Sequence, residues 1–241
     1  MLTALLGLAL WQKARDHLPY LLDPTASPPA RVSLSDGLVA AMLFFVVQGL
    51  VALVYTLNGY KATGSTVLVG FSIAGAVTFL LMRFVFWRLK SAGVPRTFGG
   101  GSVRAIGWGV AAGVAAGLAA LVYLWFVRNT ALFETARQSI EIGAGDRLWL
   151  LVLTVAAAPV FEEFIFRGLI FGGLRRTLGL AVSVLASAAI FAIVHPPIAV
   201  LPVFLLGMAA ALVYERKRLL SGPIATHATY NAIVVGYQFL S

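Results

Sequence analysis

Two adjacent glutamates and an arginine interrupt a long apolar stretch in the C-terminal half of the chain. They are Glu162, Glu163 and Arg167, in the segment A-A-A-P-V-F-E-E-F-I-F-R-G-L-I-F-G-G-L-R-R at residues 156–176. An ionised residue at the centre of a membrane helix costs about 2.5–3.5 kcal/mol, so it persists where it is paired or takes part in chemistry. On a helix, Glu163 and Arg167 form an i,i+4 pair on one face, and Glu162 lies about 100° away. We therefore expect Glu163 and Arg167 to brace a site in which Glu162 is the free carboxylate.

Three more polar side chains lie in the apolar segments that follow. His195 ends the stretch I-F-A-I-V-H-P-P, and His227 precedes Asn231 by four residues in A-T-H-A-T-Y-N, so these two share a helical face. Counting about 1.5 Å per residue from the expected cytoplasmic helix ends places Glu162 about 21 Å deep, His195 about 24 Å, Asn231 about 16 Å and His227 about 10 Å. At these overlapping depths, four side chains from three helices could meet.

Such a set is suited to activating water. A carboxylate removed from water can act as a general base, a neutral imidazole can share that role, and an imidazole with a carboxamide can donate hydrogen bonds to an oxyanion. Peptide hydrolysis fits this chemistry. Glu162, His195 and His227 could also hold zinc, although the compact H-E-x-x-H helix of metalloproteases is absent. We favour a metal-independent site, because few other polar groups are expected to fix the two imidazoles.

Other interpretations explain parts of the same set of residues. A structural ion pair, a histidine bonded to a backbone carbonyl and an asparagine joining two helices would each explain one part of the set. A serine protease elbow, G-x-S-x-G, is absent. The sequence G-A-G-D at residues 143–146 resembles the G-x-G-D of presenilin-type aspartyl proteases, but Asp16, Asp23 and Asp36 lie outside the spans or at their edge, so a second intramembrane aspartate is missing. We interpret Asp146 as a helix start.

The composition is that of an integral membrane protein. Of 241 residues, 60% are hydrophobic and 11% are charged, whereas a soluble domain is about half apolar and a quarter charged. Cysteine is absent, which excludes disulfides, Cys-ligated zinc and thiol catalysis. The net charge of +9 is typical of cytoplasmic loops and anionic lipid headgroups in such a protein, so we expect the lipid bilayer and no nucleic acid as a partner.

The fold class predicted from the apolar runs is an all-α, polytopic membrane helix bundle with about seven transmembrane helices. Residues 1–35 are expected to form an interfacial helix at Met1 to Trp11 and an irregular polar segment, residues 36–130 three transmembrane helices, and residues 147–241 a catalytic core. The fifth and sixth runs are short and could instead form a hairpin that reaches partway across. The seven runs lie at about residues 37–58, 66–87, 103–127, 147–174, 180–195, 197–214 and 222–240.

Basic residues predict the orientation of these runs. By the positive-inside rule, the connections after the second, fourth and sixth runs are cytoplasmic, which puts the N-terminus inside and the C-terminus outside. The loop between Arg128 and Arg147 has balanced charges. In the third run, Gly107, Gly109, Gly113 and Gly117 are typical of a face that packs closely on another helix. The basic clusters are Arg88, Lys90, Arg96 and Arg104; Arg175 and Arg176; and Arg216, Lys217 and Arg218.

Three motifs in this order resemble those of the CPBP family of intramembrane proteases, also called the Abi or CAAX-protease-and-bacteriocin-processing family. They are Glu162-Glu163-x-x-x-Arg167, Phe191-x-x-x-His195 and His227-x-x-x-Asn231, and the resemblance covers about residues 147–240. It implies that Glu162 and His195 activate water, and that His227 and Asn231 form the oxyanion site. Glu163 and Arg167 would support these groups. Whether a metal takes part is unsettled for the family.

The resemblance implies a peptide or membrane-protein substrate but does not identify it. An excess of Arg over Lys, with abundant Ala and Gly, favours a prokaryotic plasma membrane and argues against a prenylated substrate. Two other classes of function remain as alternatives. A proton-coupled transporter also carries intramembrane Glu, His and Arg, but usually shows an internal repeat, which is missing here. A non-catalytic immunity or binding protein of the same family would be expected to have lost some motif residues.

Overall fold

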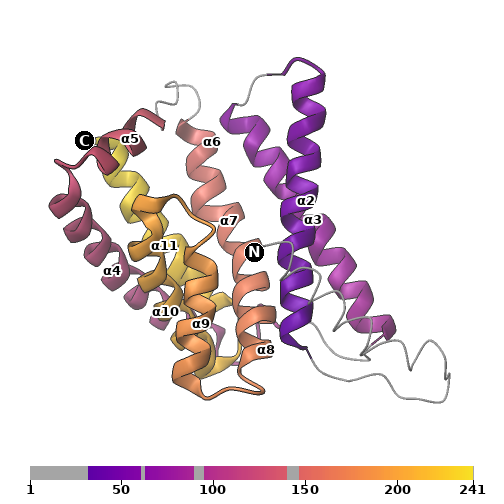
Figure 1. The fold of residues 1–241 in the computed structure, drawn as a ribbon. Helices are drawn as coiled ribbons and strands as arrows, with labels where there is room; N and C mark the ends of the chain where they lie inside the picture. The colour runs from indigo at the N-terminus through magenta and orange to yellow at the C-terminus, as the bar shows by residue number, and fades with distance from the viewer. Residues whose placement is uncertain (1–31, 61–62, 90–94, 140–146, 241) are drawn as a thin grey trace.

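The computed structural model describes residues 32–60, 63–89, 95–139 and 147–240, and within these ranges the regular secondary structure is entirely helical (Figure 1). The predicted segment from Met1 to Trp11 and the predicted helix start at Asp146 lie outside the described residues. Each of the seven apolar runs forms helix. One further helix, α5 (Ala131–Ser139), occupies part of the region predicted as a loop.

A central helix from Arg147 to Leu174 carries the two glutamates and the arginine. It is 28 residues long, so it extends about 42 Å and exceeds the roughly 30 Å of a bilayer core. Two stretches of the helix are π-helical, and such stretches often mark functional sites. Its consecutive parts are α6 (Arg147–Val152), the π-helix η2 (Leu153–Ala157), α7 (Ala158–Glu163), the π-helix η3 (Phe164–Phe171) and α8 (Gly172–Leu174).

The other long helices lie on two sides of the central helix (Figure 1). On one side are α2 (Leu34–Leu57) and α3 (Gly64–Leu89), and α2 packs against η3. The remaining helices lie on the other side. They are α4 (Ser102–Val127), α9 (Leu180–Ala192), the short 3₁₀ helix η4 (Pro197–Ala199), α10 (Val200–Lys217) and α11 (Ser221–Leu240).

Five helical segments among the described residues are long and apolar enough to cross a membrane, and the chain is a multi-pass membrane protein. By contrast, α9 has 13 residues, about 20 Å, and is too short to cross alone, as the alternative for the fifth run anticipated. The five segments are Leu34–Leu57, Gly64–Phe84, Ser102–Val127, Arg147–Leu174 and Pro197–Lys217.

Helix α2 begins at a capping box. Ser33 accepts a hydrogen bond from the Asp36 N–H, and the Asp36 carboxylate accepts one from the Ser33 N–H at 2.8 Å. Ser33 and Asp36 therefore each satisfy one backbone donor at the start of a span. This position agrees with its prediction as a residue at the edge of a span.

Three glycines of α4 let this helix approach α11 closely, as the sequence predicted. A Cβ atom on Gly113 would lie 2.5 Å from the Thr226 carbonyl oxygen, and one on Gly109 would overlap the Gly222 carbonyl oxygen. A Cβ on Gly117 would meet Ile233. Gly107 is different, because a Cβ there would meet open space. Since His227 and Asn231 are on α11, this close contact fixes the helix that carries them.

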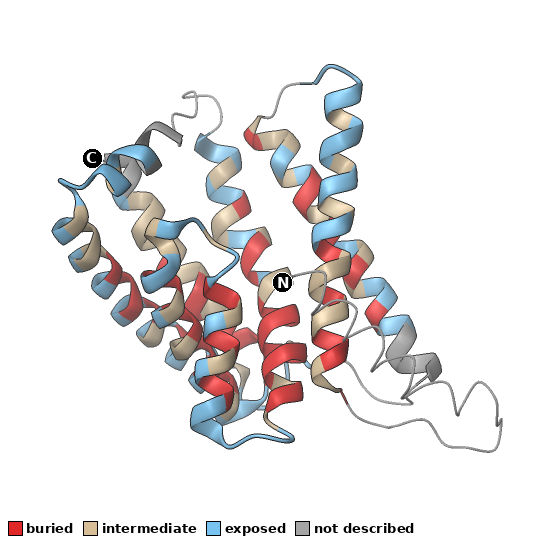
Figure 2. Ribbon diagram, viewed as in Figure 1, coloured by how far each residue is buried: buried red, intermediate tan, exposed pale blue. Residues whose placement is uncertain are grey.

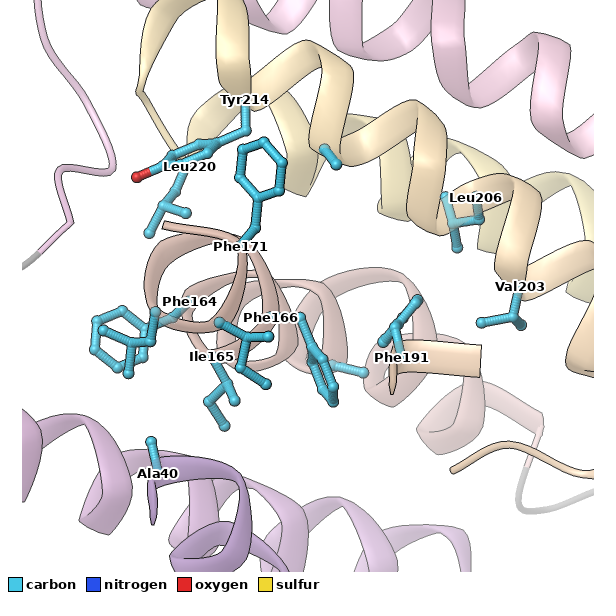
Figure 3. Packing of buried hydrophobic residues seen from close by; sticks show 14 of the residues in the cluster. Ala40, Phe164, Ile165, Phe166, Phe171, Phe191, Val203, Leu206, Tyr214 and Leu220 are labelled. Carbon is cyan, nitrogen blue, oxygen red and sulfur yellow. The ribbon is translucent and has the colours of Figure 1, made fainter. Parts of the chain in front are cut away.

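The buried core surrounds the C-terminal half of the central helix (Figure 2). Every residue of η3 is buried, and Phe166 meets Phe191 of α9 edge to face (Figure 3). Many large apolar side chains elsewhere are exposed, among them Leu50, Leu80 and Leu118, as expected for faces that contact lipid tails.

Candidate active site

Glu163 lies between Arg167 and His227 in the buried part of the central helix. Its Oε2 atom is 3.0 Å from Arg167 Nε, and its Oε1 atom is 2.9 Å from His227 Nδ1. All three residues are buried. The predicted pairing of Glu163 with Arg167 is therefore present, and the carboxylate also makes a contact with α11 that the spacing within one helix did not predict.

Arg167 is held by charge and by an aromatic ring. Its guanidinium carbon lies 4.3 Å from the centre of the Phe191 ring, a cation–π contact. Its contact with Glu163 is an ion pair rather than a well-aligned hydrogen bond, and Nη1 and Nη2 have no hydrogen-bond partner among the described residues. Arg167 thus balances the buried charge of Glu163 while Phe191 covers its face.

Glu162 is the more accessible of the two glutamates, and Arg167 pairs with Glu163 rather than with Glu162, as the sequence predicted. Its side chain is 16% exposed, whereas that of Glu163 is fully buried. Glu162 Oε2 lies 3.9 Å from His227 Nε2, which is too long for a direct hydrogen bond. Glu162 therefore faces His227 with a carboxylate that no ion pair with Arg167 ties down.

The two histidines are oriented in the same way. His195 Nδ1 lies 2.8 Å from the Phe191 carbonyl oxygen, and His227 Nδ1 contacts Glu163. Because both of these partners are acceptors, each Nδ1 carries a proton, and in a neutral ring the lone pair is then on Nε2. A histidine bonded to a backbone carbonyl was one of the structural alternatives for His195, and this bond is present. It also leaves Nε2 available for chemistry.

Phe191 joins the two histidines. Its ring centre is 4.8 Å from that of His195 and 5.6 Å from that of His227, both in edge-to-face geometry. The ring is fully buried. This places the predicted supporting residue Phe191 at the centre of the cluster, with His195 beside it rather than in direct contact with Arg167 or Glu163.

Asn231 lies one helical turn beyond His227 and bonds the central helix. Its Nδ2 atom donates to the Thr154 carbonyl oxygen at 2.6 Å. An amide group has two N–H donors, so one remains after this bond. The sequence did not single out Thr154. The available signal was Pro159, five residues later, which removes a backbone donor from the helix.

The sequence estimate of depth separated Glu162 and His227 by too much. The estimate assumed that α11 begins at the membrane surface, but Leu219, Leu220 and Ser221 are buried. The N–H groups of Leu220 and Ser221 donate to backbone carbonyls in the loop before α4. The start of α11 is thus covered by this loop, so the count began at a buried residue rather than at the membrane surface.

Zinc was a possibility for Glu162, His195 and His227. Each imidazole has an Nδ1 acceptor of the kind that holds metal-bound histidines, so the expectation of few such partners was wrong. However, no group of three or more His, Asp or Glu side chains in the described part of the chain is placed to hold a metal ion. The residues as arranged do not fit a three-ligand centre, and we derive no step through a metal.

A separate cavity of about 210 Å³ lies near the end of the central helix. It is lined by Gly168, Gly172, Tyr214 and three arginines, Arg175, Arg176 and Arg218, among others. None of the predicted catalytic residues lines this cavity. It is therefore distinct from the cluster around Phe191.

Comparison with known proteins agrees with the motifs. Residues 144–233 match the Rce1-like family, described as type II CAAX prenyl endopeptidase Rce1-like. The chain is 32% identical over 90 residues to the membrane-embedded CAAX protease MroQ of Staphylococcus aureus (strain USA300), covering 34% of this chain and 36% of that protein. It is also 32% identical over 90 residues to the putative membrane peptidase YdiL of Bacillus subtilis (strain 168), covering 37% of each. No solved structure gave a significant match.

These matches define the part of the chain that is related. The aligned region spans little more than a third of either relative. The family match includes every residue of the three motifs, from Glu162 to Asn231, together with the central helix, α9 and α11 up to residue 233. Residues 144–233 are therefore similar to Rce1-like CAAX endopeptidases, and this similarity supports the resemblance of the three motifs to the CPBP family.

Proposed function

We propose that this protein is an intramembrane endopeptidase that hydrolyses a peptide bond in a membrane-associated protein or peptide. The observation that carries the proposal is the arrangement around Glu163. Arg167 pairs with the buried carboxylate of Glu163, which also bonds His227. The more accessible carboxylate of Glu162 faces the same histidine at 3.9 Å. A structural ion pair alone explains Glu163 and Arg167, but it gives no reason for a second glutamate opposite a histidine.

Glu162 is the proposed general base. It takes a proton from water, and the resulting hydroxide oxygen attacks the carbonyl carbon of the scissile bond. His195 assists through Nε2, because its Nδ1 is bonded to the Phe191 carbonyl oxygen. When the tetrahedral intermediate collapses, the C–N bond breaks and the proton held by Glu162 passes to the leaving amine. The products are a carboxylic acid and an amine.

His227 and Asn231 are the proposed donors to the oxyanion of that intermediate. When His227 carries protons on both ring nitrogens, it donates from Nδ1 to Glu163 and from Nε2 into the site. Asn231 has a second amide N–H beyond the one used by Thr154. Hydrogen bonds from such fixed donors act where charge develops, and losing one typically costs about 10²–10³ in rate.

Glu163 and Arg167 are positioning residues in this scheme. Glu163 fixes the tautomer and the orientation of His227, and Arg167 supplies the opposite charge that a buried carboxylate requires. The substrate class follows from the surroundings, since both glutamates and Arg167 lie on a helix long and apolar enough to cross a membrane. The named relatives, a CAAX protease and a putative membrane peptidase, support cleavage of a membrane-associated chain.

The test is to map protein termini in cells that lack this protein and express either the wild type or the Glu162→Gln variant. Membrane fractions are analysed by mass spectrometry of free N- and C-termini. We expect a set of new termini with the wild type that is absent with Glu162→Gln at equal protein abundance. Identical termini in both strains would contradict the role of Glu162, and no new termini with the wild type would favour the non-catalytic alternative.

A further inference from the structure

The Thr154 carbonyl has lost its usual helical donor. In an α-helix this carbonyl would accept from the N–H of Ala158, but that N–H donates to the Leu153 carbonyl across a π-helical turn. In a π-helix it would accept from residue 159, which is proline and has no N–H. Neither position therefore supplies a main-chain donor to Thr154.

Asn231 replaces that donor from another helix. The 2.6 Å bond from its Nδ2 atom joins two residues that are 77 positions apart. The nitrogen must be the atom that faces Thr154, because a carbonyl oxygen only accepts. In a membrane segment an unpaired carbonyl is costly, since no lipid group can bond it. The missing main-chain donor in the central helix therefore favours the bond from Asn231.

Helix α11 is consequently attached to the central helix at two points on one face. His227 and Asn231 are four residues apart, and they bond Glu163 and the Thr154 carbonyl respectively. A single contact would let α11 turn about it, whereas two contacts along one face fix its rotation. On another face of α11, Gly113 of α4 lies too close to Thr226 for a side chain.

We propose that Pro159, through the Thr154 carbonyl and Asn231, is a positioning residue that sets the rotation of α11 and holds the His227 ring between Glu163 and Glu162. Its importance for cleavage rests on the proposed function. The attachment of α11 to the central helix does not depend on that function, and both tests measure it without any substrate. In this view Asn231 contributes through the position of His227 as well as by any contact with substrate.

The first test is a double-mutant cycle on thermal stability with Pro159→Ala and Asn231→Ala. Asn231→Ala strands the Thr154 carbonyl, and we expect the melting temperature in detergent to fall by about 2–6 °C. Pro159→Ala restores a backbone N–H, so adding Asn231→Ala in that background should cost little. The control is Pro223→Ala in the first turn of α11, where a helix needs no N–H donor. In that background Asn231→Ala should retain its full cost.

The second test reads the position of His227 by NMR. The chain has three histidines, so ¹⁵N-histidine labelling gives few signals, and the His195 signal serves as an internal reference. We expect the protected Nδ1–H signal of His227 to be lost in Asn231→Ala and in the double variant, although the double variant regains stability. Asn231→Asp keeps the shape of the side chain but lacks the N–H donor, so it should also lose the protected His227 signal. This variant replaces the double-mutant cycle if Pro159→Ala does not fold.

Two results would overturn the proposal. Equal costs of Asn231→Ala with and without Pro159 would mean that the proline does not create the need for Asn231. A protected His227 signal in Asn231→Ala would mean that Asn231 does not position the ring. Because neither measurement involves cleavage, both outcomes are independent of whether the protein proves to be a protease.

Discussion

Replacing either glutamate by glutamine should reduce cleavage, but the two replacements should affect stability very differently. Glu163 is fully buried with Arg167 and His227 as partners, so Glu163→Gln leaves the guanidinium without its counter-charge. Breaking a buried ion pair typically costs about 3–5 kcal/mol. At about 2–4 °C per kcal/mol for a chain of this size, the melting temperature should fall by about 6–20 °C.

Glu162 should behave differently. Its side chain is 16% exposed, and its contact with His227 is 3.9 Å, beyond hydrogen-bond range. Glu162→Gln should therefore cost less than about 1 kcal/mol, which is at most about 4 °C. It should nevertheless abolish cleavage. Both variants should lose cleavage, but only Glu163→Gln should also lose much stability. This difference would distinguish Glu163, the positioning residue, from Glu162, the base.

The assay is thermal unfolding of purified protein in detergent, followed by the fluorescence of its five tryptophans. The matched control is Glu215→Gln, because Glu215 also pairs with arginines, at 2.9 Å and 2.6 Å, but its side chain is 21% exposed. Exposed pairs contribute about 0–1 kcal/mol, so this variant should stay close to the wild type. A loss for Glu163→Gln no larger than that for Glu215→Gln would refute the reasoning.

Three further predictions concern packing, metal and topology. Gly113→Ala would place a Cβ atom 2.5 Å from an α11 carbonyl oxygen, so we expect a cost of about 1–3 kcal/mol and reduced cleavage. Gly107→Ala faces open space and should be neutral or slightly stabilising; equal melting temperatures for the two variants would contradict the close contact. Cleavage should survive treatment with chelators, and elemental analysis showing near-stoichiometric zinc whose removal and return switch cleavage off and on would reverse this conclusion. Reporter fusions should place residues 95 and 217 in the cytoplasm and residue 140 outside, and finding 95 and 217 on opposite sides would break the predicted order of spans.

Features that depend on one helix were predictable from the sequence. The apolar runs gave the helices, because a bilayer demands long segments without exposed backbone groups. The four-residue spacing of Glu163 and Arg167 predicted their ion pair, which is present at 3.0 Å. The glycines of the third run predicted a close helix contact, and Gly109, Gly113 and Gly117 make that contact with α11, whereas Gly107 does not.

Features that depend on the register between helices were not predictable. The bond between Glu163 and His227 joins residues 64 positions apart, and nothing within either segment fixes their relative height. The burial of the start of α11 under another segment was not predictable for the same reason. The bond from Asn231 ends on a backbone carbonyl at Thr154, so no side-chain motif marks it. Only Pro159 hinted that a carbonyl in the central helix needed an external donor.

The central claim is that Glu162 activates water for peptide hydrolysis, and cleavage in a purified system tests it most directly. The wild type and the Glu162→Gln variant are reconstituted at equal amounts in lipid vesicles with a membrane protein found by terminus mapping. A general base contributes about 10²–10⁴ in rate, so the account predicts at least a roughly 100-fold slower cleavage by the variant, with its melting temperature nearly unchanged. Cleavage by Glu162→Gln at the wild-type rate would contradict it.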